Sequence, residues 1–319
     1  MYRIGIDLGG TNIACGLVSD EMKIIAKVSV PTGADREPGL IVDDMAAACR
    51  ALVEKAGITV GDIAAIGIAS PGIANHDDGV VEYANNLPFR RFPIASMLRE
   101  RFPVDNIRVE NDANAAAWGE AVAGAAKGTS SSVMITLGTG VGGGIIVDGK
   151  VQSGFNYAGG ELGHIVICAG GRKCSCGRRG CWEAYSSATA LIAMTSEKIE
   201  QCAREGRKTV MNDLAAEKGK VSARTAYDAM RLGDEAAQEV VDEYVYYLAC
   251  GLTNIVNIFQ PEVISIGGGI SNEKDTLLKP LIPIIRKEQY GGGLVPETEI
   301  RIAELGNDAG IIGAAFLGL

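Results

Sequence analysis

Apolar and polar residues alternate in short runs over the first 30 residues, and such alternation is typical of β-strands. We expect strands over residues 3–7, 14–19 and 24–30, joined by tight turns at 9–12 and 20–21. The chain therefore begins as a meander of short strands.

Further along, short apolar runs that end in Gly or Pro predict buried strands, and longer runs with helical spacing predict helices. The expected strands cover 63–69, 107–110, 132–137, 143–147, 263–266 and 300–303. The expected helices cover 40–56, 112–123, much of 188–257 with a long apolar-rich segment at 235–257, and 308 to the end. Strands that alternate with helices indicate an α/β fold.

A length of 319 residues fits two domains. With an offset of 129, Leu8-Gly9 falls on Leu137-Gly138, which hints at a duplicated fold whose halves each open with a hairpin. No low-complexity linker marks the boundary. We expect an N-terminal α/β domain over 1–123, joined by the C-terminal helix 308–319, and a larger C-terminal α/β domain over 124–307.

Composition narrows the function classes. The chain is 47% hydrophobic and 22% charged, as expected for a globular protein, and its net charge of −9 argues against nucleic acid as a partner. No run of 18 apolar residues is present, so we expect no membrane span. The first residues lack a signal-peptide pattern, and the eight cysteines form no evident secreted framework, so we expect a cytoplasmic protein.

One histidine and three thiols lie close together in the sequence. Three thiolates and one imidazole fit the closed tetrahedral shell of a structural Zn²⁺, and the intervening glycines let the chain wrap around one ion. Buried, unliganded thiols are the alternative, since five other cysteines are scattered along the chain. We favour zinc, and the expected ligands are His164, Cys174, Cys176 and Cys181.

Two glycine-rich turns follow predicted strands and are candidates for phosphate binding. Glycines let backbone N–H groups approach a phosphate, and a plain hairpin turn is the alternative for each. A third stretch, Gly267-Gly268-Gly269, offers a flat surface for an adenosine or only a turn into a helix. The expected nucleotide contacts are Gly9, Gly10, Thr11, Asn12, Gly138, Thr139, Gly140, Gly268 and Gly269, with Asp7 available for Mg²⁺.

Asp112 lies where a predicted strand meets a predicted helix. It could be only a helix N-cap, or a general base that takes the proton from a hydroxyl attacking a phosphate. Asn86 lies in a polar loop and could bind hydroxyls or merely build a turn. We expect His76, next to two aspartates, to be a solvated loop residue without a role.

Taken together, these motifs resemble the ROK family, named after repressors, open reading frames and kinases. The matching runs are Asp7-x-Gly9-Gly10-Thr11-Asn12, Glu110-Asn111-Asp112-Ala113-Asn114, Leu137-Gly138-Thr139-Gly140-x-Gly142-Gly143-Gly144, Glu161-x-Gly163-His164, Cys174 to Glu183, and Gly267-Gly268-Gly269. The run 181–188 and the stretch 254–262 are similar to those of the bacterial glucokinases of this family.

The resemblance implies an actin-like ATPase, hexokinase-like (ribonuclease H-like) fold with a cleft between two α/β domains. It implies ATP-dependent phosphorylation of glucose to glucose 6-phosphate, with Mg²⁺ accompanying ATP and Asp112 as the general base. It implies that zinc is structural and orders the sugar site. The residues that it assigns to the sugar are Asn86, Asn111, Asp112, Glu161, His164 and Glu183.

The sequence leaves four points open. The substrate could be N-acetylglucosamine, N-acetylmannosamine, mannose, fructose or allose, and the phosphate donor could include polyphosphate. A sugar-responsive regulator is a remote alternative, since the acidic charge and the retained Asp112 favour catalysis. The resemblance suggests a homodimer or homotetramer.

Overall fold

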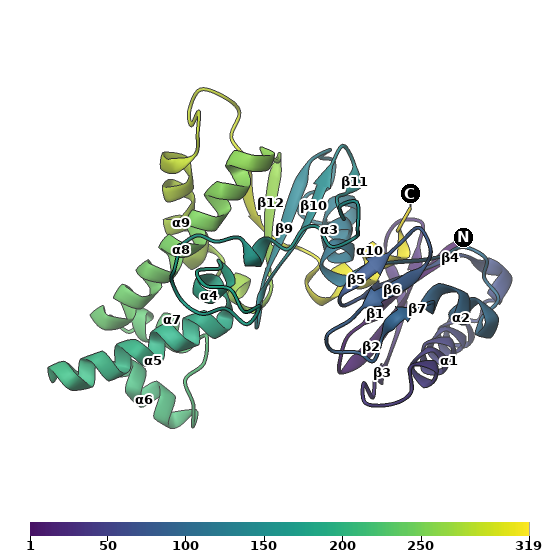
Figure 1. Cartoon of the computed structure of the whole chain (residues 1–319), viewed down its shortest axis with the longest axis horizontal. Helices are drawn as coiled ribbons and strands as arrows, with labels where there is room; N and C mark the ends of the chain where they lie inside the picture. The colour runs from purple at the N-terminus through teal and green to yellow at the C-terminus, as the bar shows by residue number, and fades with distance from the viewer. Residues whose placement is uncertain (319) are drawn as a thin grey trace. The chain divides into compact units, whose positions relative to one another are not determined.

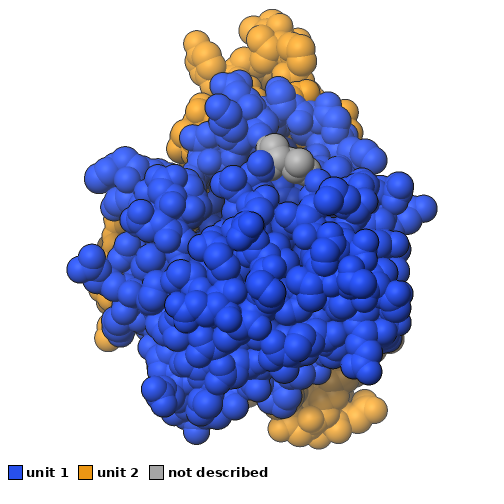
Figure 2. All heavy atoms as spheres, turned by 90° about the vertical axis from the view of Figure 1, so that its right-hand side faces the viewer, with its two compact units in different colours: residues 1–134, 143–160, 303–319 blue, residues 135–142, 161–302 orange. Residues whose placement is uncertain are grey.

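The computed structural model describes residues 1–318, which form two compact units. Unit 1 comprises Met1–Met134, Gly143–Gly160 and the described residues from Ala303 onward, and unit 2 comprises Ile135–Gly142 and Glu161–Ile302. Figure 2 draws unit 1 in blue and unit 2 in orange. The expected α/β class is confirmed, because each unit combines strands with helices.

A mixed five-stranded sheet forms the framework of unit 1, in the order β3-β2-β1-β4-β8. The first three strands form the expected antiparallel meander, and β4 and β8 add to it in parallel. The strands are β1 (Tyr2–Leu8), β2 (Asn12–Ser19), β3 (Ile24–Pro31), β4 (Ile63–Ser70) and β8 (Ile107–Asn111).

Helices cover both faces of this sheet, and the alternation of side chains along β1 explains how (Figure 1). Ile4 and Ile6 share a buried cluster with residues of two helices on one face. Gly5 points to the other face, where its missing Cβ would lie 1.8 Å from the carbonyl oxygen of Ile311. The helices on the first face are α1 (Pro38–Ala56) and α2 (Ile94–Arg101), and those on the second are α3 (Asp112–Ala123) and α10 (Ala309–Ala315).

The contact between α3 and α10 is a backbone contact as well. A Cβ on Gly313 would lie 1.7 Å from the carbonyl oxygen of Ala115, and one on Gly119 would lie 2.3 Å from that of Ala309. A buried carboxylate holds the chain that leads to α10, because Glu120 accepts hydrogen bonds from the N–H groups of Glu304 (3.1 Å) and Leu305 (2.8 Å). The C-terminal helix is thus part of the core of unit 1.

A small antiparallel sheet follows β4, which the sequence analysis did not expect. Its strands are only three or four residues long, in the order β5-β6-β7. Short strands of this kind carry too little alternation to be seen as a pattern. They are β5 (Ile73–Asn75), β6 (Val80–Tyr83) and β7 (Arg90–Phe92).

The second five-stranded sheet has the order β11-β10-β9-β12-β13. The hairpin of β10 and β11 is antiparallel, and β12 and β13 are parallel. The sequence predicted all of these strands except the shortest, β11. They are β9 (Ser132–Leu137), β10 (Val141–Val147), β11 (Lys150–Val151), β12 (Val263–Gly267) and β13 (Glu299–Ile302).

Helices make up most of unit 2, and the long apolar-rich helix α8 is its centre. Trp182 is fully buried against this helix, where a Cβ on Gly251 would lie 2.0 Å from the indole ring. The indole N–H donates to the carbonyl oxygen of Tyr247 at 3.1 Å. The helices are α4 (Glu183–Ser186), α5 (Ala188–Glu205), α6 (Val210–Glu217), α7 (Thr225–Arg231), α8 (Glu235–Phe259) and α9 (Asp275–Glu288). Among residues 1–318, no helix combines the length and the apolar character that crossing a bilayer requires.

The close contact between α3 and α10 predicts that a single methyl group added at Gly313 strongly lowers the stability of the fold. Gly313→Ala should lower the free energy of unfolding by about 3 kcal/mol or more, because the new Cβ meets a backbone oxygen that cannot move alone. Gly39→Ala in α1 is the matched control. Its nearest neighbour would be 3.8 Å away, so we expect a change within about 1 kcal/mol. Thermal unfolding measures both, and equal stability of the two variants would contradict the packing argument.

Candidate functional site

The turn from β8 into α3 carries Asn111 and Asp112, and the structure separates their roles. The side-chain oxygen of Asn111 accepts hydrogen bonds from the N–H groups of Ala113 (2.9 Å) and Asn114 (3.2 Å), so Asn111 is the N-cap. Its amide donates to the carbonyl oxygen of Gly72 at 3.0 Å. Asp112 is therefore not needed as the cap, and its exposed carboxylate is available to a ligand.

Asp112 and Asp7 influence each other electrostatically within unit 1. Burial raises the pKa of Asp7 to about 6, with the charge of Asp112 as the second cause and Lys27 opposing both. Loss of hydration among the surrounding protein atoms also raises the pKa of Asp112, although part of its side chain reaches solvent. Two carboxylates whose charged forms are both disfavoured on balance suit a divalent cation, because a cation stabilises their negative charge further than the N–H of Ala113 and the charge of Lys27 do.

The first glycine-rich turn lies beside this carboxylate pair. It joins β1 and β2, and the N–H of Gly9 donates to the carbonyl oxygen of Asn12 at 2.9 Å. Gly10 and Thr11 are exposed at its tip. A Cβ on Gly10 would lie 3.4 Å from Cβ of Asn86, so the loop between β6 and β7 packs against the turn. The expected nucleotide turn and one expected sugar residue are thus neighbours.

A buried carboxylate next to Asn111 was missed by the sequence analysis. One oxygen of Glu110 accepts from the N–H of Asn111 (2.8 Å) and the amide of Asn114 (3.1 Å). The other lies 3.2 Å from Nδ1 of His76 and 3.4 Å from the hydroxyl of Ser153. His76 is therefore more than a solvated loop residue, since it contacts the carboxylate that orders the turn. The contacts span 34 and 43 residues, so no local pattern could reveal them.

The second glycine-rich turn, between β9 and β10, is bound to the start of two helices in unit 2. The N–H of Ala188 donates to the carbonyl oxygen of Gly138 at 2.8 Å, and the hydroxyl of Thr189 donates to that of Thr139 at 2.8 Å. A Cβ on Gly140 would lie 2.3 Å from Oε2 of Glu183, so a larger residue there would displace this carboxylate from its present position. The third stretch packs on the same strand, with Gly268 at a φ of +83° against the backbone of Leu137.

Glu183, at the first turn of α4, joins this glycine turn to the cysteine loop. One carboxylate oxygen accepts from the N–H of Val141 at 3.0 Å. The other accepts from the hydroxyl of Ser175 at 3.1 Å and lies 3.8 Å from Sγ of Cys174. Glu161 is exposed, and its carbonyl oxygen accepts from the N–H of His164 at 3.0 Å.

The four expected metal ligands lie together, with one ligand atom from each of His164, Cys174, Cys176 and Cys181 inside 4.8 Å of all the others. Nδ1 of His164 is 3.6 Å from Sγ of Cys174, and the Sγ atoms of Cys176 and Cys181 are 3.7 Å apart. Zn–S bonds of about 2.3 Å and Zn–N bonds of about 2.0 Å in a tetrahedron require about 3.8 Å between sulfurs and about 3.5 Å between nitrogen and sulfur. The donor set fits zinc in its chemistry, and these two pairs have the spacing that a tetrahedral zinc requires.

The expected sugar residues are divided between the two units. Asn86, Asn111 and Asp112 belong to unit 1, and Glu161, His164 and Glu183 belong to unit 2. Within each unit they are close to a glycine-rich turn, to a candidate metal ligand or to each other. Each unit therefore contains three of the six expected sugar residues.

The raised pKa of Asp7 generates a test of stability against pH. The folded state holds this proton more tightly than the unfolded chain, so the penalty for ionised Asp7 is absent below about pH 4 and complete above about pH 6. Asp7→Asn should therefore stabilise the metal-free protein by roughly 2–3 kcal/mol at pH 8, and by much less at pH 4. Thermal unfolding in EDTA-free, magnesium-free buffer measures this, with Asp105→Asn, an exposed position, as the control. Equal shifts at both pH values would contradict it.

Residues 3–319 match the model of the ROK family. A glucokinase from Halalkalibacterium halodurans is 37% identical over 99% of this chain and 94% of its own length. The crystal structure of a ROK family glucokinase from Streptomyces griseus, in complex with glucose and AMPPNP, is 34% identical, covers 99% of both chains and has a TM-score of 0.78. A ROK hexokinase from Thermus thermophilus is 33% identical over 99% of this chain and 97% of its own, with a TM-score of 0.80.

Proposed function

The chain belongs to the ROK family and is an ATP-dependent hexose kinase, and on this basis we propose that it converts glucose to glucose 6-phosphate. The observation that carries the choice of sugar is the near full-length likeness, at 34–37% identity, to proteins named as glucokinases. The separation of Asn111 as cap from Asp112 as an exposed carboxylate supports the chemistry.

Asp112 is proposed as the general base. Its carboxylate accepts the proton of the sugar 6-hydroxyl while that oxygen attacks the γ-phosphorus, and the bond to the bridging oxygen breaks to release ADP. Phosphoryl transfer needs mainly positioning and neutralisation of charge, so one placed carboxylate suffices as a base. The raised pKa of Asp112 makes it a better proton acceptor than an ordinary aspartate.

The nucleotide is proposed to bind to the glycine-rich turns. Gly9, Gly10, Thr11 and Asn12 would present backbone and hydroxyl donors to phosphate oxygens, and so would Gly138, Thr139 and Gly140. Gly268 and Gly269 would face the adenosine. Mg²⁺, which accompanies ATP, would bind at Asp7, where it would relieve the unfavourable charge beside Asp112.

The sugar is proposed to bind to Asn86, Asn111, Glu161, His164 and Glu183. With Nδ1 of His164 directed toward Cys174, its Nε2 is the nitrogen left for a sugar hydroxyl. Zinc held by His164, Cys174, Cys176 and Cys181 would have a structural role, because it fixes the loop that carries Ser175 and Glu183. The free thiols of this cluster require a reducing compartment, so we place the enzyme in the cytoplasm. The expected homodimer or homotetramer stays a prediction.

The choice of substrate is tested by a coupled ADP-release assay on zinc-loaded protein. With Mg-ATP as donor, kcat/KM for glucose should exceed the values for N-acetylglucosamine, N-acetylmannosamine, mannose, fructose and allose. Preference for another of these sugars would overturn the glucose assignment and keep the kinase. Absence of turnover with all six, despite saturable sugar binding, would favour the sugar-responsive regulator.

Asp112→Asn tests the base. We expect kcat to fall by about a thousandfold or more, while the dissociation constant for glucose changes by less than about tenfold, because the lost interaction acts mainly in the transition state. Asp105→Asn is the matched control, since this exposed aspartate lies in the loop just before β8. A variant at Asp112 that keeps more than a tenth of the wild-type kcat would refute the assignment.

Cys176→Ser tests the metal. The variant should lose zinc, measured by mass spectrometry of the purified protein, and its KM for glucose should rise by about 10- to 100-fold, because the metal orders the loop that carries Glu183. Cys250→Ser, in α8 and outside the cluster, should keep both properties. A zinc-free variant with an unchanged KM would show that the metal does not order the sugar site.

A further inference from the structure

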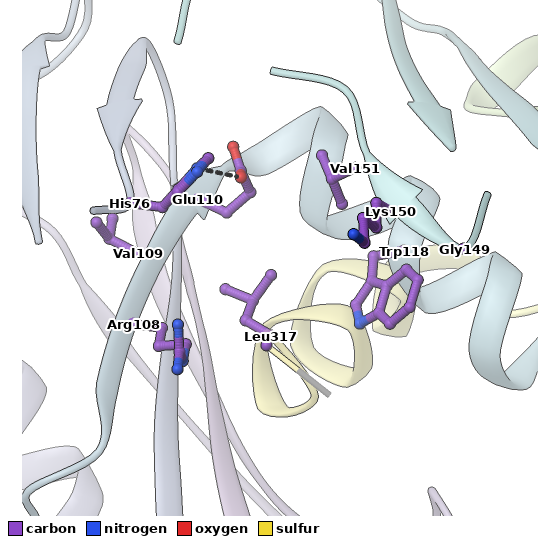
Figure 3. A pocket seen from close by; sticks show the side chains of 10 residues that line it. His76, Arg108, Val109, Glu110, Trp118, Gly149, Lys150, Val151 and Leu317 are labelled. Atoms are coloured by element: carbon purple, nitrogen blue, oxygen red, sulfur yellow. Dashed lines mark hydrogen bonds and ion pairs between the residues drawn. The ribbon is translucent and has the colours of Figure 1, made fainter. Parts of the chain in front are cut away.

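Unit 1 contains a pocket beside strand β8, which leads to the turn with Asn111 and Asp112. The pocket has a volume of about 270 Å³, and its lining includes Arg108, Glu110, Trp118, Lys150 and Leu317. Figure 3 shows these side chains around the open space, with Arg108 and Lys150 on opposite sides in this view. None of these residues is among those assigned to glucose or to ATP.

The pocket has two cations, Arg108 and Lys150, on its lining. Within residues 1–318, neither the guanidinium of Arg108 nor the ammonium of Lys150 forms an ion pair or a side-chain hydrogen bond. The carboxylate in the pocket, that of Glu110, is already engaged by His76 and by the N–H of Asn111. In a chain with 30 basic and 39 acidic residues, two unpaired cations facing one pocket favour an anionic ligand.

The remaining wall of the pocket is apolar and fixed. The indole N–H of Trp118 donates to the carbonyl oxygen of Phe316 at 2.9 Å, so the ring is held in place and offers its carbon atoms to the pocket. Val151 and Leu317 are half-buried beside it. A pocket smaller than the roughly 300–1,000 Å³ of drug-sized sites suits a small molecule with one apolar group.

We propose that this pocket binds a small organic anion, a phosphate or carboxylate attached to an apolar group, and that the anion regulates the kinase. Arg108 and Lys150 bind the charged group, and Trp118 packs against the apolar group. The site is separate from the sugar and nucleotide residues, so it acts on them through the protein.

Glu110 connects the pocket to the reaction. Glu110 is part of the pocket lining, and its Oε2 lies 3.2 Å from Nδ1 of His76. Its Oε1 accepts hydrogen bonds from the N–H of Asn111 and the amide of Asn114. An anion in the pocket competes with Glu110 for His76 and loosens this arrangement. The regulation, unlike the binding, rests on the proposed roles of Asn111 and Asp112, and we expect KM for the sugar to rise when the anion is bound.

Binding is measured first, without sugar or ATP. Phenyl phosphate and benzoate are titrated against the full chain, with phenol and benzyl alcohol as uncharged counterparts, and tryptophan fluorescence is the readout. The chain has two tryptophans, and Trp182 is fully buried, so Trp118 reports on the pocket. We expect saturable binding of at least one anion and none of the alcohols. Tighter phenyl phosphate identifies a phosphate ligand, and tighter benzoate identifies a carboxylate ligand.

Variants locate the binding. The double substitution Arg108→Ala/Lys150→Ala should weaken it at least tenfold, and Val151→Phe, which fills the pocket, should abolish it. Lys127→Ala, another exposed and unpaired lysine of unit 1, should leave it unchanged. No saturable binding of either anion, or equal binding by wild type and double variant, would overturn the proposal.

Regulation is then measured on the same proteins. The bound anion should raise KM for the preferred sugar at least threefold in the wild type and in Lys127→Ala, and should leave the double variant unaffected. If the protein turns over no sugar, the proposed function fails while the binding result stands. If glucose is phosphorylated and the anion binds without changing KM, the regulatory role is refuted and the proposed function stands.

Discussion

The structure of unit 1 depends on one close approach of backbones. Helix α10 lies directly on β1 and on α3, because Gly5, Gly119 and Gly313 leave no side chain between them. The same helix reaches the carboxylate of Asp7, which would lie 3.0 Å from a Cβ on Gly310. Asp7 is the last residue but one of β1, and Asp112 is the first residue of α3. The packing that closes the core therefore also fixes the positions of the two carboxylates that are proposed to act in the reaction. The raised pKa values of Asp7 and Asp112 show that their charged forms are destabilised in the fold, and such shifts are typical of functional sites.

Much of the fold follows from the sequence because it is encoded locally. The alternation in the first 30 residues predicted the strands β1 to β3, and the long apolar run at 235–257 predicted α8. The metal cluster could also be predicted, since Cys174, Cys176 and Cys181 are separated by few residues and by glycines. A short loop of this composition has few ways to arrange its thiols other than around one point.

The rest could not be predicted because it depends on contacts between distant segments. The three short strands β5 to β7 follow from packing rather than from periodicity. The N-cap of α3 is Asn111, one residue before Asp112, which the sequence had offered as a possible cap. The link from Glu110 to His76 and Ser153 joins segments that are 34 and 43 residues apart, and a single sequence carries no local signal for such contacts.

Glu183 shows how the proposed zinc could matter for catalysis without touching ATP. Its carboxylate binds the N–H of Val141 in the second glycine-rich turn and the hydroxyl of Ser175 in the cysteine loop. A carboxylate held from both sides can move only if one of those segments moves. If the proposed zinc were lost, Ser175 would be freed, and the change would pass through Glu183 to Gly140, where the absence of a Cβ leaves room for that carboxylate. The cysteine loop, Glu183 and the second glycine-rich turn are therefore linked through one carboxylate, so a metal held by the four candidate ligands would act on the proposed sugar and nucleotide residues through that link.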